Sequence, residues 1–490
     1  MRHMVWLALA AGPGMVCAET LDPVDQAYLN SLIDTQGMAA AFDFAFEAGD
    51  ELTEHSFDAA SGVGAHVGEG RRFTRFPRAD LNGPGEWATH VPKREGGANA
   101  TSCIACHNAP EANGAGDVAL NAVIDPNHTG DPSKFLERNT LHLFALGIPQ
   151  RIAEEMSKEL YSQRDDLRTL SCDAGQGQID LIAKGIEFGT LSATSTQKAP
   201  CEVSFDTSLV TGVDPDLVIK PFGWKGNHAT IRAFTRGAAH NELGLQAVEL
   251  VGDQDGDYDG VTHELTVGDM TALTIYMAAL ERPTSLVELA AQGVIDLDDA
   301  QRAEITSGER RMAEVGCTSC HQPKLPIADP VFSEPSQTEG FHDVVFPDGS
   351  SPAEHAMTTA VTFDLTRDQP NNRLEGAHLG AVPVVDGVAQ AEWYSDFRRH
   401  DMGEALADPE GSQGIERRHW LTRSLAGVGS TGPWLHDGRA TTLHEAIVAH
   451  GGAALSSRDA YLALPDAHQA EIVAFLENLV IHKTDEDEDH

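Results

Sequence analysis

The chain contains the stretch Cys103-Ile-Ala-Cys106-His107 and, much further along, a second copy of the same pattern, Cys317-Thr-Ser-Cys320-His321. In each copy the two thiols can form thioethers to the vinyl groups of a haem, and the adjoining histidine can bind the haem iron. A zinc site would need a second pair of ligands close by in sequence, and a thioredoxin-type redox pair does not require a histidine directly after the second cysteine. The repeated pattern therefore predicts two covalently bound haem c groups, with His107 and His321 as axial iron ligands.

An apolar helix is predicted to close the block that begins with each haem-binding string. In residues 268–281 apolar side chains recur with helical spacing until Pro283 ends the run, and residues 466–481 repeat this spacing after Asp466, which could cap the helix. The stripes consist of Met270, Leu273, Met277 and Leu280 in the first helix and of Ile472, Phe475, Leu476 and Leu479 in the second. A string followed by such a helix is the order found in small cytochrome c folds. We therefore expect a mainly α protein with two cytochrome c-like haem domains and long loop-rich insertions.

The insertions are expected at about 120–215 and about 325–395, where Gly, Pro, Asp and Thr are frequent and no sustained periodicity is present. A further helix is expected within residues 30–48. The predicted organisation is a signal peptide (1–18), an N-terminal extension (19–94), an N-terminal haem domain (95–284), a C-terminal haem domain (285–483) and an acidic tail (484–490).

The first residues have the pattern of a secretory signal. Arg2 precedes an apolar run, a Gly-Pro-Gly break follows, and Val16-Cys17-Ala18 resembles a cleavage site with small residues. A lipid anchor on Cys17 is the alternative interpretation. No later stretch is long and apolar enough to suggest a membrane span. Because covalent haem attachment is itself an export-side process in bacteria, we expect a periplasmic protein.

Cys172 and Cys201 are the cysteines that neither the signal segment nor the haem-binding strings use. In an oxidising compartment they could form a disulfide that closes a loop within the first insertion. Two free buried thiols are the alternative.

Composition limits the choice of partners. With 490 residues and 41% hydrophobic content the chain can form two or three domains with real cores. Its formal net charge of −41 disfavours nucleic acids and anionic membranes, and it favours basic partners or solubility alone.

A histidine at the end of a predicted helix is the best candidate for a further iron ligand. Thr442 and Glu445 form the pattern of a capping box at a helix start. Helical spacing then puts His450 on the same face as the apolar residues and His444 on the opposite side. We therefore expect His450 to be the second axial ligand of the His321-ligated haem.

Several motifs resemble the bacterial di-haem cytochrome c peroxidases and the related methylamine dehydrogenase-maturing enzymes. The motifs are Ser395-Asp-Phe-Arg-Arg-His-Asp-Met-Gly403, Trp434-Leu-His-Asp-Gly-Arg-Ala440 and His450-Gly-Gly452, and the resemblance extends over about residues 95–482. The chain is most similar to the di-haem oxidoreductase, or thiol oxidoreductase-like, branch. In the peroxidases the position of His450 is a methionine that binds the C-terminal haem. The resemblance therefore implies a low-potential, bis-histidine electron-transfer haem here, with Met402 as the second choice of ligand.

A second similar stretch consists of Phe222-Gly-Trp-Lys-Gly-Asn-His228 and Ala239-His-Asn-Glu-Leu-Gly-Leu245. By resemblance, Trp224 lies between the two haems as an electron relay, and Glu242 is the acid-base residue above the peroxide-binding haem. The chain departs from the family at Lys225, where the peroxidases have aspartate, and in a shorter spacing to the glutamate. Other candidates for the distal side of this haem are His128, His228 and His240.

These residues together predict a di-haem oxidoreductase. Hydrogen peroxide is the expected substrate, bound at the His107-ligated haem, and a small periplasmic cytochrome or cupredoxin is the expected electron donor. Two alternatives remain open. The chain could be an electron-transfer cytochrome in which both haems are six-coordinate, or an oxidase or oxygenase whose long loops bind another substrate.

An acidic loop could bind calcium. Asp253, Asp255, Asp257 and Asp259 alternate with other residues, and Glu264 follows them, as in calcium-binding loops. Counted from Asp255, however, the position that should carry the last glutamate is Thr266. The alternative is a solvated acidic loop.

Overall fold

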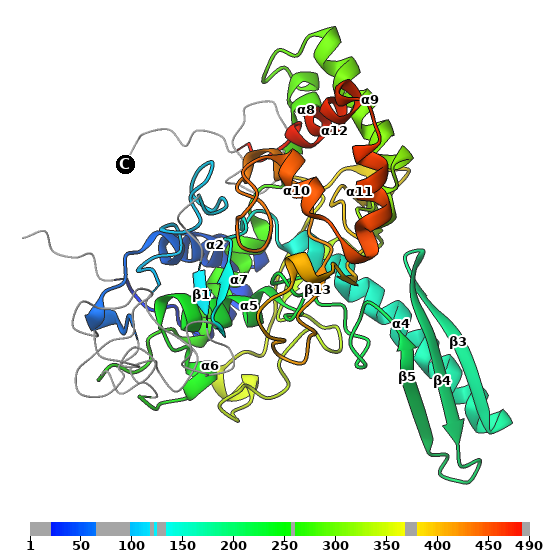
Figure 1. Cartoon of the computed structure of the whole chain (residues 1–490). Coiled ribbons are helices and arrows are strands. Elements are labelled where there is room, and N and C mark those ends of the chain that lie inside the picture. Colours follow the sequence, from blue (N-terminus) through cyan, green and yellow to red (C-terminus); the bar gives the residue numbers. More distant parts are fainter. Residues whose placement is uncertain are drawn as a thin grey trace, which may run out of the picture.

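The computed structural model describes residues 21–64, 99–117, 122–124, 134–255, 260–367 and 380–482. Figure 1 shows a helical part built around α2, α5 and α7, a second group formed by α8 to α12, and an arm of α4 with β3 to β5 that projects away from both. The predicted signal peptide, His128, Asp257, Asp259 and the acidic tail lie outside the described residues.

The long helix α7 (Val267–Ala279) is the centre of the first part. It begins at a capping box between Thr266 and Asp269, and all of its residues are buried. The helix predicted at 268–281 is thus confirmed, although it is enclosed on every side rather than on one face. Helix α2 (Met38–Glu54) packs across it at Gly49, where any Cβ would overlap the carbonyl of Ala272. The remaining helices here are α1 (Gln26–Gln36), α5 (Ile231–Ala238), the π-helix η3 (Ala239–Leu243) and α6 (Val248–Val251).

The first predicted insertion is regular structure rather than loop. Helix α4 (Gly147–Ala174) is followed by an antiparallel sheet in the order β3 (Gln176–Ala183), β4 (Ile186–Ser195) and β5 (Val203–Val210). The inward side chains of β4 pack on α4 through residues such as Phe188, while the other face stays polar. A disulfide joins Cys172 near the end of α4 to Cys201 before β5. The predicted disulfide is thus confirmed, and the alternative of two free thiols is wrong.

The C-terminal helices enclose a smaller core of their own. Helices α9 (Asp299–Glu314) and α12 (Asp466–Glu477) touch at Gly308, where a Cβ would overlap the carbonyl of Glu471. The predicted helix at 466–481 is confirmed up to Glu477, but its N-cap is Pro465, so the prediction that Asp466 caps it is wrong. The other helices of this part are α8 (Leu286–Ala291), α10 (Leu443–Ala449), α11 (Leu455–Leu462) and the short η4 (Cys317–Ser319).

The prediction of a mainly α fold is wrong, because several antiparallel sheets make the protein a mixture of helix and strand. Their strands are mostly too short to produce a recognisable alternation in the sequence. The short pairs are β1 (Ala122–Ile124) with β2 (Leu136–Arg138), β8 (Val331–Glu334) with β9 (Val361–Asp364), β12 (Arg399–Asp401) with β13 (His419–Leu421), and β6 (Thr284–Ser285) with β14 (Leu479–Val480). Strands β7 (Leu325–Ile327), β10 (Val384–Val385) and β11 (Val388–Ala391) form a small sheet within the second predicted insertion. Short helical turns complete the fold at η1 (Ala59–Ser61), η5 (Pro352–His355), η6 (Glu404–Leu406), η7 (Val428–Ser430) and η8 (Gly452–Ala454).

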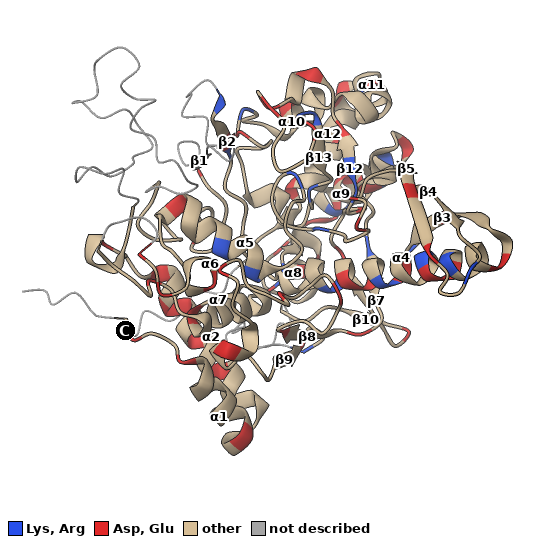
Figure 2. Cartoon of the chain, turned by 90° about the horizontal axis from the view of Figure 1, so that it is seen from below, with Lys and Arg blue, Asp and Glu red and all other residues tan. Residues whose placement is uncertain are grey.

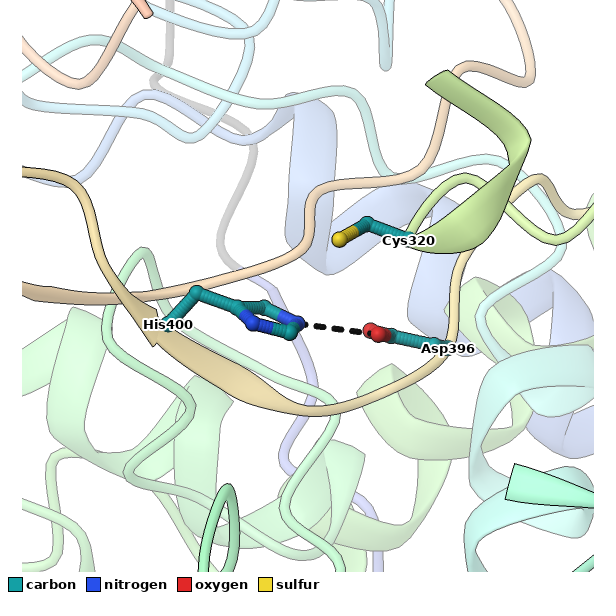
Figure 3. A group of neighbouring side chains, drawn as sticks. All are labelled: Cys320, Asp396 and His400. Atoms are coloured by element: carbon teal, nitrogen blue, oxygen red, sulfur yellow. Dashed lines mark hydrogen bonds and ion pairs between the residues drawn. The ribbon is translucent and has the colours of Figure 1, made fainter. Parts of the chain in front are cut away.

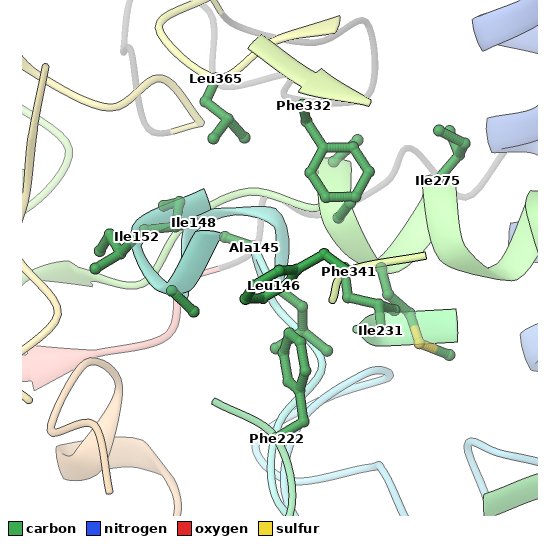
Figure 4. Packing of buried hydrophobic residues seen from close by; sticks show 14 of the residues in the cluster. Ala145, Leu146, Ile148, Ile152, Phe222, Ile231, Ile275, Phe332, Phe341 and Leu365 are labelled. Carbon is green, nitrogen blue, oxygen red and sulfur yellow. The ribbon is translucent and has the colours of Figure 1, made fainter. Parts of the chain in front are cut away.

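The main hydrophobic core joins segments that are far apart in the sequence. Figure 4 shows Ile148 and Ile152 at the start of α4 near Phe222, Phe332 and Leu365. Because the beginning of α4 is part of this core, the arm is anchored to the body rather than attached by a flexible linker.

The surface is acidic over most of the molecule. Figure 2 shows Asp and Glu on many elements, including α1, α2 and α4, and fewer basic positions. Among the described residues, no helix has both the length and the apolar character needed to cross a membrane.

Candidate functional site

Both haem-binding strings form the same tight turn at the wall of a cavity. In the first, the amides of Cys106 and His107 donate to the carbonyl of Cys103 at 3.1 and 3.0 Å. In the second, the amide of His321 donates to the carbonyl of Cys317 at 3.0 Å. The turn brings both sulfur atoms and the following imidazole of each string to the same cavity.

The electrostatics of these strings fit metal-binding histidines and unreactive thiols. Burial lowers the pKa of His107 and that of His321 to about 4, so both rings are neutral at neutral pH, as metal ligation requires. Burial also raises the pKa of Cys103 to about 12 and that of Cys317 to about 11. A thioredoxin-type cysteine has a lowered pKa, so these thiols do not fit that alternative.

The imidazole of His321 is oriented by the backbone. Its Nδ1 lies 3.2 Å from the carbonyl oxygen of Tyr394, which leaves Nε2 for another partner. His450 lies close enough to lower the pKa of His321 further by its charge.

His450, the predicted second ligand, lines the second cavity. The capping box of Thr442 and Glu445 starts α10 as predicted, and His450 follows directly after the last residue of that helix. Its Nδ1 lies 2.8 Å from the carbonyl of Ala446, and the residue lines the cavity. Met402 lines the same cavity. His444 instead contacts the hydroxyl of Tyr461 at 2.8 Å and is not among the lining residues.

The two cavities share a wall. The residues that line both are Asn139, Thr140, Leu141, His142, Leu146, Trp224 and Arg423. Trp224 is held there by a 2.8 Å hydrogen bond from its Nε1 to the carbonyl of Asn139, and the Arg423 guanidinium lies 5.6 Å from its ring. Trp224 thus lies between the cavities, where the resemblance predicts it.

Lys225 explains how the segment after Trp224 is fixed. Its Nζ donates to the carbonyls of Glu416, Arg417 and His419 at 3.2, 3.1 and 3.1 Å. It also forms a buried ion pair with Asp408 at 3.1 Å. The lysine that departs from the peroxidase pattern therefore ties the Trp224 segment to the chain that carries β13.

Glu242 lies in the wall of the first cavity, on the π-helix η3. The side chain of Asn99 donates to its Oε2 at 2.8 Å, and the amides of Asn99 and Ala100 donate to its backbone carbonyl. Single π-turns are frequent at functional sites because they displace a side chain from the regular helical position. The carboxylate is therefore held in a defined orientation at the cavity.

Of the predicted distal histidines, His228 lines the first cavity and His240 does not, although His240 is buried. Burial lowers the pKa of His228 to about 4, so its ring is neutral. The ring lies against Phe234, with the ring centres 5.7 Å apart.

Figure 3 shows Cys320, Asp396 and His400 together; the last two lie in the motif Ser395–Gly403 but were not predicted as site residues. His400 Nε2 lies 2.9 Å from Asp396 Oδ2, and Cys320 completes the group. Burial lowers the pKa of His400, but hydrogen bonds with Asp396 and Cys320 outweigh this effect and raise it to about 9. Cys320, which belongs to the second haem-binding string, and His400 both line the second cavity, so the group belongs to that site rather than to a separate metal site.

Other lining residues were also missed, among them His142 and Arg423 in the shared wall and His436, which stacks on Trp420 with the ring centres 4.1 Å apart. His142 and Arg423 lie outside the motifs that resemble the peroxidases, whereas His436 lies within the motif Trp434–Ala440, in which nothing marked it as a lining residue.

The acidic loop is partly described. Asp253 Oδ1 pairs with His263 Nε2 at 2.7 Å, Asp255 Oδ2 accepts from the Gly260 amide, and Glu264 Oε2 accepts from the Gln246 amide. These contacts engage the carboxylates with the protein itself, and calcium binding here stays a prediction.

The two adjacent cavities share a wall, and each has two cysteines and a neutral histidine among its lining residues, the set of groups that a haem c site requires. Residues 372–479 match the family described as "Di-haem oxidoreductase, putative peroxidase", which confirms the predicted resemblance over that range and implies haem cofactors. No curated protein matches. Among solved structures, one of hydrazine synthase from Kuenenia stuttgartiensis, pressurised with xenon, aligns with 98% of this chain and 99% of its own at 13% identity and a TM-score of 0.31. Similarity at that level does not establish a shared fold.

Proposed function

We propose that the protein is a periplasmic di-haem c-type oxidoreductase that reduces hydrogen peroxide with electrons from a small donor protein. The observation that carries the proposal is the pair of cavities with a common wall, because it puts an oriented carboxylate on one side of Trp224 and His450 on the other. The matching family supports an oxidoreductase role.

The residues fit two haem c groups. Cys103 and Cys106 would form the thioethers of the first haem, and Cys317 and Cys320 those of the second. The neutral rings of His107 and His321 would bind the two irons, and His450 would complete the second site as a bis-histidine centre. When bound, the haem groups supply the electrons that reduce the peroxide O–O bond.

Glu242 would move the proton that this reduction requires. Its carboxylate accepts a proton from one peroxide oxygen and delivers it to the departing oxygen, which leaves as water. Overall, one hydrogen peroxide, two protons and two electrons give two waters. The Asn99 hydrogen bond to Oε2 keeps the carboxylate pointing in one direction during this transfer. The apolar lining of the cavity, including Leu243 and Phe234, limits the entry of bulk water.

Electrons would enter at the His321 and His450 side and pass Trp224 in the shared wall. The acidic surface favours a donor with a basic docking face, because opposite charges accelerate encounter. The Cys172–Cys201 disulfide is consistent with export to an oxidising compartment.

The variant Glu242→Gln tests the acid-base role. It keeps the shape of the side chain but removes the proton acceptor, so peroxide turnover should fall by about a hundredfold to ten-thousandfold. Glu304→Gln, on the exposed face of α9, is the matched control and should keep full turnover. Equal turnover in Glu242→Gln and the unaltered protein would contradict the role.

One observation favours a second candidate, an electron-transfer cytochrome. His228 is neutral and lines the first cavity, so it could act as a sixth ligand there. The variant His228→Ala would then open the first haem and change its spin state, whereas in a peroxidase with an already open site the spin state would stay the same.

A further inference from the structure

Arg423 lies where the two cavities meet. It follows β13, lines both cavities and lies over the Trp224 ring. Its Nη1 donates to the carbonyl of Gly223 at 3.2 Å, whereas its Nε is inaccessible to solvent and has no hydrogen-bond partner in the described part of the chain.

Other arginines of this protein with little solvent exposure have carboxylate partners. Arg232 pairs with Glu249 and Glu334, and Arg138 forms two hydrogen bonds with Asp408 at 2.9 and 2.7 Å. Among the described residues, no carboxylate pairs with Arg423. Burial lowers its pKa to about 10, so the guanidinium still carries its charge at neutral pH.

A buried charge without a counterion is costly, because it loses its hydration and gains no opposite charge in return. The guanidinium is also planar and suited to two parallel hydrogen bonds with a carboxylate. The missing partner is therefore expected to be an anion that enters with whatever fills the cavities.

We propose that Arg423 binds the propionate carboxylates of the haem groups at the junction of the two cavities and so couples their charges. This inference rests on the proposed occupancy by two haems but not on peroxide as the substrate. A fixed positive charge at the junction stabilises the more negative, reduced state of each haem, so it raises both reduction potentials.

Midpoint potentials measured by spectroelectrochemical titration of the haem-loaded full chain test the proposal. In Arg423→Gln the ratio of oxidised to reduced haem at a given potential should rise at least tenfold for each haem. For a one-electron couple this corresponds to a midpoint potential at least 59 mV lower. Arg423→Lys keeps the charge, so both potentials should stay close to those of the unaltered protein. Arg310→Gln, which removes an exposed charge on α9, is the control and should leave both potentials unchanged.

Haem content per chain, measured in each variant, shows whether it still folds around both groups. If Arg423→Gln does not retain both haem groups, the test is a comparison of the resonance Raman spectra of Arg423→Lys and of the unaltered protein. The propionate bands of these two proteins should differ. Unchanged potentials in a fully loaded Gln variant, a shift at only one haem, or identical propionate bands would overturn the proposal. Potentials of the unaltered protein that depend on chloride concentration would also overturn it, because a free anion would then occupy the site. A shift of both potentials in a protein without peroxide turnover would refute the proposed substrate and leave this inference standing.

Discussion

Replacing Lys225 by methionine should loosen the chain that borders the second cavity. The ammonium group is buried, donates to three backbone carbonyls and pairs with Asp408. Methionine has a similar length and fills the same space without any donor. Asp408 keeps its two hydrogen bonds from Arg138. The carbonyls of Arg417 and Glu416 keep the hydrogen bonds that they accept from the amides of Asp408 and His419, so the variant removes the bonds of the ammonium group without leaving these acceptors unpaired.

Because Asp408 is not left as an unpaired charge, the cost is that of losing hydrogen bonds to a charged group, which typically contribute about 1.5 to 3 kcal/mol. Every 1.4 kcal/mol is a factor of ten in an equilibrium constant, so local opening should become at least about tenfold more frequent. The affected amides include Met402, which donates to Arg418, and Leu421, which donates to Trp224. Native-state hydrogen exchange, read by mass spectrometry on peptides covering 399–421, measures this opening directly.

Lys220→Met is the matched control. Lys220 belongs to the same segment and also forms ion pairs, with Asp214 and Asp216 at 2.7 and 3.0 Å, but it is more exposed. Such pairs contribute about 1 kcal/mol or less. Equal protection of peptides 399–421 in the two variants would refute the role of Lys225 in holding this segment.

Three further variants test other parts of the account. The double variant Cys103→Ala with Cys106→Ala should lower the haem content to one per chain in a pyridine haemochrome assay, and two retained haems would contradict covalent attachment at this string. His450→Met should raise the potential of the second haem by at least 59 mV, a tenfold shift for one electron, whereas an unchanged potential would exclude His450 as its ligand. Cys172→Ala with Cys201→Ala opens a link between residues 29 apart, so the arm should lose about 3 to 4 kcal/mol of protection in hydrogen exchange while both haems stay bound; unchanged protection would refute a stabilising disulfide.

The sequence predicted the features that rest on short, dense patterns. The capping box at Thr442 and the helix before Pro283 depend on residues a few positions apart, and the structure has both. The position of Trp224 came from the family resemblance rather than from its own surroundings.

The predicted fold class was wrong because short strands leave only a weak pattern in a single sequence. Strands such as β12 have three residues, too few for an alternation to stand out, and they are stabilised by partners distant in the chain. Helix α4 was missed because its first half is buried and its second half is largely exposed, so no single apolar stripe runs along it.

The shared wall could not be predicted for a related reason. Arg423 and His142 are separated by most of the chain and belong to no motif used here, and only folding brings them to the same two cavities. Lys225 was noticed as a departure from a pattern, but its partners at 416, 417 and 419 are known only from the structure.

The most direct test of the central claim is the electron paramagnetic resonance spectrum of the purified haem-loaded protein, fully oxidised and half-reduced, before and after addition of hydrogen peroxide. We expect a low-spin bis-histidine signal from the second haem, together with a high-spin ferric signal from the first that disappears when peroxide is added. Two low-spin signals that peroxide leaves unchanged in both redox states would contradict this expectation and identify the protein as an electron carrier.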